Sequence, residues 1–250
     1  MTGHFFTLYH ESFKSRDVYA LAISHPGQGY SEPYPTSASA KKYVETDMKP
    51  FLNGMFGNKN ISVIGYSMGS SIAGYMAATM TQVENVGLLA SVAPLEPFYE
   101  DEIEMNKNLF NVRLLFMHDI TRRIYAYLGM NLLHYKRGNV WTSAEVLTTN
   151  SANSTIRQLF ADDLFRGSAL GMDGLLFAFE VMNSDWGFDF DLLSKKNVLI
   201  VSGELDDRCN KSIQFFLHQR IRNSRLVTYN GAHSDVLDKL DEYAVDLLKF

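Results

Sequence analysis

The sequence contains almost no cysteine: Cys209 is the single thiol among 250 residues. One cysteine cannot form a disulfide within the chain, and it excludes a zinc site built from several thiolates. Disulfide-rich frameworks are typical of secreted proteins, whereas free thiols persist in reducing compartments. From the cysteine content we therefore expect a cytoplasmic protein.

Long apolar runs and an excess of positive charge are also missing. No run approaches the roughly 20 apolar residues that a membrane-spanning helix needs, and the N-terminus lacks the pattern of a secretory signal. The 23 basic and 28 acidic residues give a net charge of −5 and are interspersed along the chain. Because nucleic-acid binding requires a basic face, we expect no nucleic-acid partner. Because no apolar run is long enough to span a bilayer, we expect no membrane anchor.

Two common cofactor signatures are absent. The seven histidines show no His-x-x-x-His or His-Glu-x-x-His spacing, so the sequence predicts no metal site. Gly27 and Gly29 lie in a turn-rich loop but do not continue into a Gly-x-Gly-x-x-Gly fingerprint. We therefore expect no metal, no dinucleotide and no other cofactor.

Apolar runs of strand length alternate along the chain with segments of helical periodicity. The predicted strands are 18–23, 61–66, 86–92, 198–202 and 225–229. Helical stripes are predicted over 3–15, over 40–55 with Pro50 as a kink or break, directly after Ser67, over 213–221 and over 236–248. This alternation predicts an α/β protein with a doubly wound, mostly parallel sheet covered by helices on both faces.

The strand signal disappears between residues 95 and 195. That interval is far longer than ordinary α/β connections, and its aromatic, Leu and Met residues recur at mostly helical spacing. We predict a helical cap at 95–195, inserted between a first core part, 1–94, and a second core part, 196–250. An apolar cap would suit a small-molecule substrate with an apolar acyl or aromatic group.

The pattern Gly65-Tyr66-Ser67-Met68-Gly69 stands between a predicted strand and a predicted helix. Gly-x-Ser-x-Gly in that context is typical of a nucleophile elbow, a tight turn that points the serine hydroxyl away from the sheet. The two glycines are expected to let strand and helix pack without clashes at Cβ.

A serine hydroxyl is a poor nucleophile unless a base takes its proton and a carboxylate orients that base. Asp206 and His233 each follow a later predicted strand. Loops after parallel strands emerge at one edge of the sheet, so Ser67, Asp206 and His233 are expected to meet there. Asp207 is a neighbouring alternative for the acid.

Five landmarks make the chain resemble the α/β-hydrolase superfamily over nearly its whole length. They are the loop 25–31, the elbow 65–69, the Trp-Gly-Phe-Asp-Phe run 186–190, Gly-Glu-Leu-Asp 203–206 and Gly-Ala-His 231–233. The resemblance implies Ser67 as nucleophile, His233 as general base and then acid, and Asp206 as orienting acid. It also implies the Met68 amide as one oxyanion donor, and Glu96 as a second place where such proteins put the acid.

Members of that superfamily carry a strand and a His-Gly-type loop before the first helix, and the loop supplies a second oxyanion amide. Here only residues 1–3 precede the predicted helix. The missing strand would lie between those at Val18 and Ile61, and each backbone group left unpaired there would cost about 1–3 kcal/mol. We therefore expect a fragment, an alternative start or a truncated gene model. We expect either that no strand lies between the strands at Val18 and Ile61 or that those two strands pair directly.

The resemblance favours a serine hydrolase that cleaves an ester or related acyl bond through an acyl-enzyme. Related folds perform amidase, carbon–carbon hydrolase, acyltransferase and lyase chemistry with the same residues, and these alternatives stay open. A non-enzymatic binding or scaffold role is a third hypothesis.

Overall fold

The computed structural model describes residues 3–34, 37–94 and 173–250, together with residues 124, 127, 158, 162 and 163. Most of the predicted cap lies outside the described residues, as does the alternative acid Glu96. The account below concerns the described residues.

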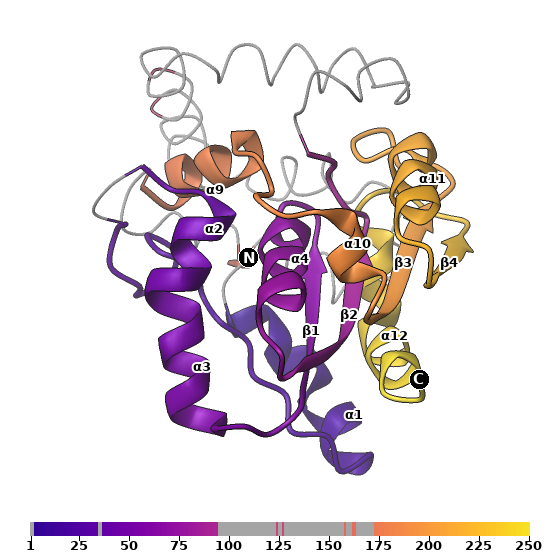
Figure 1. The fold of residues 1–250 in the computed structure, drawn as a ribbon, viewed down its shortest axis with the longest axis horizontal. Coiled ribbons are helices and arrows are strands. Elements are labelled where there is room, and N and C mark those ends of the chain that lie inside the picture. Colours follow the sequence, from indigo (N-terminus) through magenta and orange to yellow (C-terminus); the bar gives the residue numbers. More distant parts are fainter. Residues whose placement is uncertain are drawn as a thin grey trace.

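A four-stranded parallel sheet forms the centre of the protein (Figure 1). Its strands are β1 (Ile61–Tyr66), β2 (Val83–Leu89), β3 (Asn197–Gly203) and β4 (Ser224–Tyr229), in the spatial order β1-β2-β3-β4. All three pairings are parallel, so the carboxyl ends of the strands meet at one edge. These elements confirm the predicted α/β fold, with β2 beginning and ending three residues earlier than expected.

Helices cover both faces of this sheet, as Figure 1 shows. On one side lie α4 (Gly69–Thr79), α9 (Asp173–Asn183), α10 (Phe190–Leu193) and α11 (Lys211–Arg220). On the other side lie the 3₁₀ turns η1 (Gly3–Tyr9) and η4 (Asp235–Lys239) and the helices α1 (His10–Ser15) and α12 (Leu240–Leu247). Strand residues alternate between the two sides, so Leu88 faces the first layer of helices and Leu89 the second.

The helical stripe around Pro50 is continuous rather than broken. It consists of α2 (Ala40–Tyr43), a π-helical turn η2 (Val44–Met48) and α3 (Lys49–Phe56). In a regular α-helix the proline ring would clash with the carbonyl four residues earlier, and it removes one hydrogen bond. The wider turn offers a physical reason why the helix continues, because it changes the spacing directly before Pro50.

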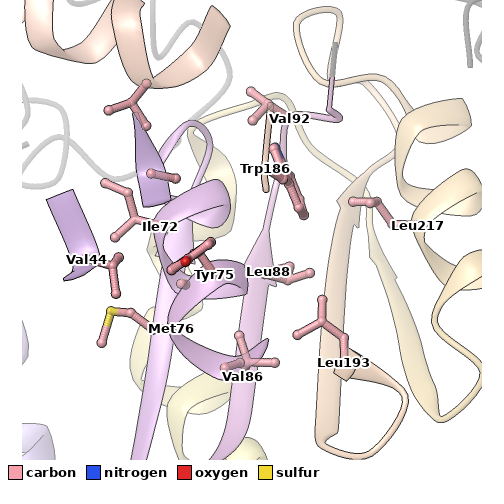
Figure 2. Packing of buried hydrophobic residues seen from close by; sticks show 14 of the residues in the cluster. Val44, Ile72, Tyr75, Met76, Val86, Leu88, Val92, Trp186, Leu193 and Leu217 are labelled. Carbon is pink, nitrogen blue, oxygen red and sulfur yellow. The ribbon is translucent and has the colours of Figure 1, made fainter. Parts of the chain in front are cut away.

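The larger apolar core lies between the sheet and the layer that contains α4 (Figure 2). Leu88 of β2 is fully buried there among Tyr75 of α4, Leu193 of α10 and Trp186. Trp186 packs against Phe188 and Phe190 with ring centroids 5.7 and 5.9 Å apart. Because Trp186 lies in the same buried cluster as Leu88 of β2, this group of rings packs against the sheet.

The predicted strand at Val18–Ile23 is wrong. Residues 18–23 form neither strand nor helix, and Tyr19 and Leu21 are 78% and 39% exposed. A strand needs a hydrogen-bonded neighbour, and no backbone bond joins this run to β1 among the described residues. The expectation about a gap between strands at Val18 and Ile61 therefore does not apply, and among the described strands β1 pairs only with β2.

The core predicts a position-dependent response within α11. Leu217 is fully buried and Phe215, two residues earlier, is 46% exposed. Leu217→Ala should lower the free energy of unfolding by about 2–5 kcal/mol, because it leaves a cavity. Phe215→Ala should change it by no more than about 0.5 kcal/mol. Urea denaturation followed by circular dichroism measures both, and equal losses would contradict the assignment of the inner face.

Candidate active site

Ser67 occupies a strained turn between β1 and α4. Its φ is +53°, a left-handed conformation that is uncommon outside glycine. The turn is held on both sides: the Ser67 amide donates to the Leu89 carbonyl at 2.8 Å, and the Ser67 carbonyl accepts from the Ser70 amide at 3.0 Å. Strain of this kind costs about 1–3 kcal/mol and is concentrated at functional sites.

The two glycines of the elbow have different roles. A Cβ on Gly65 would lie 2.4 Å from the Gly69 carbonyl oxygen and 2.6 Å from Ser70 Cα, so only glycine fits. A Cβ on Gly69 would meet nothing within 4 Å. The expectation of a steric need therefore holds for Gly65 and is wrong for Gly69, whose missing side chain faces open space.

The loops after β3 and β4 are joined by backbone hydrogen bonds. The Glu204 amide donates to the Tyr229 carbonyl at 2.9 Å, and the Leu205 amide donates to the Gly231 carbonyl at 3.0 Å. A Cβ on Gly203 would lie 2.7 Å from that Gly231 oxygen, so a side chain there would force the loops apart. This close approach sets the loop of Asp206 beside the loop of His233.

The structure brings Ser67, His233 and Asp206 into one hydrogen-bonded line. Nδ1 of His233 lies 2.8 Å from Oδ2 of Asp206, and Nε2 lies 3.0 Å from Oγ of Ser67. His233 and Asp206 are 8% and 4% exposed. Asp206 can thus hold the Nδ1–H tautomer, which leaves Nε2 free to accept a proton from the serine.

Backbone donors fix the Asp206 carboxylate. Its Oδ1 accepts from the amides of Arg208 and Cys209 at 2.9 and 2.8 Å, while Oδ2 faces His233. The side chain of Asp206 is fully buried, whereas the neighbouring Asp207 is exposed. Of the two adjacent aspartates, the structure places Asp206 against the imidazole.

Two residues that the sequence analysis missed brace the turn before His233. The Tyr229 hydroxyl donates to the Ala232 carbonyl at 2.8 Å, and Oδ2 of Asp235 accepts from the Ala232 amide at 2.8 Å. Aspartate side chains commonly accept a hydrogen bond from a nearby backbone amide in turns. The sequence Ala-His-Ser-Asp could therefore have predicted the contact of Asp235 with the Ala232 amide. Nothing local in the sequence indicated the contact from Tyr229.

The surroundings of His233 change its pKa in opposing directions. Burial lowers the pKa, because it penalises the imidazolium, but the Asp206 carboxylate that lies 2.8 Å from Nδ1 raises it. The net result is a pKa well above the usual 6.5. Tyr66 lies against the imidazole with ring centroids 5.1 Å apart, and burial raises the pKa of its phenol, which keeps it neutral.

His25 and Met68, two further positions from the sequence analysis, lie outside the line of hydrogen bonds formed by Ser67, His233 and Asp206. His25 stacks on Phe177 and lies edge-on to Tyr43, each at 5.8 Å between ring centroids, and burial lowers its pKa to about 3. The His25 imidazole is therefore neutral and packed between aromatic rings, and the hydrogen-bonded line to Ser67 runs through His233. Met68 directly precedes α4 as its N-cap residue, so its own amide lies outside the ladder of helical hydrogen bonds.

Within the described ranges no group of three or more His, Cys, Asp or Glu side chains is arranged to hold a metal ion. No helix among the same residues is long and apolar enough to cross a bilayer.

The chain matches one protein-family model and is similar to many solved structures. A family model of the alpha/beta hydrolase fold matches residues 14–240. An esterase from Exiguobacterium antarcticum and a bromoperoxidase from Bacillus anthracis are similar structures, at 17% and 16% identity, each with a TM-score of 0.72. Both alignments cover 100% of this chain and 88% of the other. MenH from S. aureus is 19% identical with a TM-score of 0.66, over 99% of this chain and 89% of its own. No curated protein matches the sequence.

The contact between Asp206 and His233 predicts a shift in the histidine titration. In wild-type protein the pKa of His233, followed by NMR of the imidazole, should lie above 6.5. Asp206→Asn removes the carboxylate and should lower this pKa, while Asp207→Asn, one residue away, should leave it nearly unchanged. An equal response to the two substitutions would contradict the pairing. Because the folded-state pKa is raised, the stability that protonated His233 contributes should be present below pH 6.5 and lost as pH rises through that pKa.

Proposed function

Because the chain belongs to the α/β-hydrolase fold family, we propose that it is a serine hydrolase that cleaves an ester or related acyl bond. One observation carries the proposal: His233 bridges Ser67 and Asp206 with hydrogen bonds of 3.0 and 2.8 Å. The fold alone would not support it, since one fold hosts many activities and the site decides between them.

In the first half of the proposed reaction Ser67 Oγ attacks the acyl carbonyl. Nε2 of His233 takes the hydroxyl proton across the 3.0 Å hydrogen bond, and the Asp206 carboxylate stabilises the imidazolium that results. When the tetrahedral intermediate collapses, His233 returns the proton to the leaving alcohol. An acyl-enzyme on Ser67 remains.

In the second half the same imidazole acts on water. Neutral His233 removes a proton from the water as it attacks the acyl-enzyme, and then protonates Ser67 as the acid leaves. The position of Met68 at the start of α4 supports its amide as one donor to the oxyanion, because the N-terminus of a helix favours negative charge. Loss of a single oxyanion donor costs about a hundred- to a thousandfold in rate, so this amide matters to turnover.

We further propose that residues 95–195 form a helical cap that covers the site and selects the substrate. Support comes from the aromatic, Leu and Met residues of that segment, which recur at mostly helical spacing, and from its described end, where α9 and α10 are helical. An apolar cap favours a substrate with an apolar acyl or aromatic group. The segment would then contribute specificity, and the core would contribute the reacting groups.

Other reactions can use the same three residues. Amide, carbon–carbon and acyl-transfer chemistry remain alternatives, as does a binding protein that retains the triad. The ester hydrolase is favoured because an ester carbonyl is more electrophilic than an amide carbonyl and an alkoxide leaves more easily than an amide anion, so a site with one proposed oxyanion donor is better suited to esters.

The proposal predicts covalent labelling at one residue. A fluorophosphonate probe should attach to wild-type protein at Ser67, and Ser67→Ala should abolish the adduct and reduce ester hydrolysis by at least about a thousandfold. Ser15→Ala, which alters an exposed serine on α1, should retain both. Circular dichroism establishes that the variants are folded. A folded Ser67→Ala protein that still labels would exclude Ser67 as the nucleophile.

Substrate comparison separates the alternatives. Initial rates on p-nitrophenyl esters of increasing acyl length, compared with the matching p-nitroanilides, should favour the esters and depend on acyl length. All ester activity should disappear in His233→Ala, because the base is lost. Anilide turnover that equals or exceeds ester turnover would favour the amidase alternative.

A further inference from the structure

The inner face of α11, the helix that packs against β3 and β4, includes a buried polar side chain (Figure 1). The apolar residues buried on this helix are Ile213, Phe216 and Leu217. Gln214 stands among them in the sequence, carries a primary amide and is 0% exposed. A buried amide is costly unless hydrogen bonds replace those that it makes with water. Gln214 meets this requirement with three hydrogen bonds to the main chain.

Two of these hydrogen bonds join Gln214 to Ser91, which follows β2. Oε1 of Gln214 accepts from the Ser91 amide at 3.3 Å, and Nε2 donates to the Ser91 carbonyl at 2.7 Å. The preceding residue, Ala90, has a φ of +43°, and its amide donates to the Val201 carbonyl of β3 at 2.9 Å. A left-handed conformation is unfavourable for alanine and persists only where neighbouring contacts hold the chain. Gln214 supplies two such contacts at the next residue.

The third hydrogen bond joins Gln214 to the loop that carries Asp206. Nε2 has a second hydrogen, which it donates to the Cys209 carbonyl at 3.4 Å. The amide of the same Cys209 donates to Oδ1 of Asp206 at 2.8 Å, and Oδ2 of that carboxylate faces His233. The main chain of Cys209 thus connects the Gln214 amide with the acid of the candidate triad.

The end of β2 also contacts the loop of the nucleophile. The Ser67 amide donates to the Leu89 carbonyl at 2.8 Å, two residues before Ser91. One short segment therefore contacts the elbow through Leu89 and the Asp206 loop through Ser91 and Gln214. Because both loops are bonded to this segment, a change at Gln214 alters the support of the acid while the elbow keeps its own contact.

From these contacts we propose that Gln214 is a positioning residue: its buried amide joins the Asp206 loop to the end of β2 and so holds the Asp206 carboxylate against His233. The inference rests on the proposed function, since Gln214 acts through the proposed acid. Loss of the amide would leave the Cys209 carbonyl and the Ser91 main chain without these bonds. A displacement of about 1 Å at a catalytic group can cost about a hundredfold in rate.

Two substitutions of Gln214 test the proposal. Gln214→Met nearly keeps the side-chain volume and removes all three hydrogen bonds. In Gln214→Glu, burial raises the pKa of the new carboxyl and keeps it neutral, so it retains one donor and one acceptor for Ser91 but has no second hydrogen for Cys209. Leu217→Ala is the matched control, because it removes apolar packing from the same buried face of α11 and no side-chain hydrogen bond.

Two measurements on the folded full chain report on the acid. NMR titration of the imidazole should give a lower His233 pKa in both Gln214 variants than in wild type, a change in the direction of Asp206→Asn. Initial rates with p-nitrophenyl acetate should show kcat lowered by about tenfold to a hundredfold in Gln214→Met, with KM nearly unchanged. Gln214→Glu should lose less, because it keeps the Ser91 contacts. Leu217→Ala should be less stable, yet retain the wild-type pKa and kcat.

Two results would overturn the proposal. A wild-type His233 pKa in folded Gln214→Met would show that the amide does not act on Asp206, and Gln214→Glu gives the same test if the methionine variant does not fold. Equal losses in Gln214→Met and Leu217→Ala would show a general effect of stability. The titration needs no turnover, so it decides the role of Gln214 even if labelling rejects Ser67 as the nucleophile. Labelled Ser67 with an unchanged titration would reject the role of Gln214 alone.

Discussion

The line of hydrogen bonds from Ser67 through His233 to Asp206 depends on one constraint, the parallel alignment of β1, β3 and β4. Because these strands run in the same direction, the residues that follow them emerge at one edge of the sheet. Segments 166 residues apart in the sequence thus come within hydrogen-bonding distance. An antiparallel strand at any of the three places would carry its residue to the opposite edge.

The local backbone then refines this coarse placement. Gly65 lets α4 approach β1 closely enough to form the strained turn at Ser67, and Gly203 lets the loop after β3 contact the loop after β4. Asp206 is fixed by amides of its own loop. The reacting groups are therefore held mainly by main-chain contacts, which change little when surface side chains vary.

Much of this arrangement could be predicted from the sequence. Apolar runs located all four strands, because β2 and β3 are mostly buried and β1 and β4 are partly buried. The elbow pattern located Ser67 through its strand–turn–helix context. The strand predicted at 18–23 was wrong because a strand needs a hydrogen-bonding neighbour as well as apolar residues. The run has no such neighbour among the described residues. The sequence motif could not show that Gly69 faces open space, because that depends on the three-dimensional surroundings of the residue. The same holds for the hydrogen bonds that Tyr229 and Asp235 make to Ala232.

β1 pairs with β2 on one side, and its carboxyl end leads into Ser67. The strand is thus supported by β2 on one side and by side-chain packing above and below. The packing from both layers therefore restrains the strand that positions the nucleophile.

The central claim is that Ser67 forms a covalent acyl-enzyme. Rapid-quench measurement with p-nitrophenyl acetate, followed by peptide mapping by mass spectrometry, tests it most directly. The account predicts a burst of p-nitrophenol close to one equivalent per active site, with one acetyl group on the peptide that contains Ser67. Steady hydrolysis with no burst and no acetylated Ser67, or an acetyl group on another residue, would contradict it.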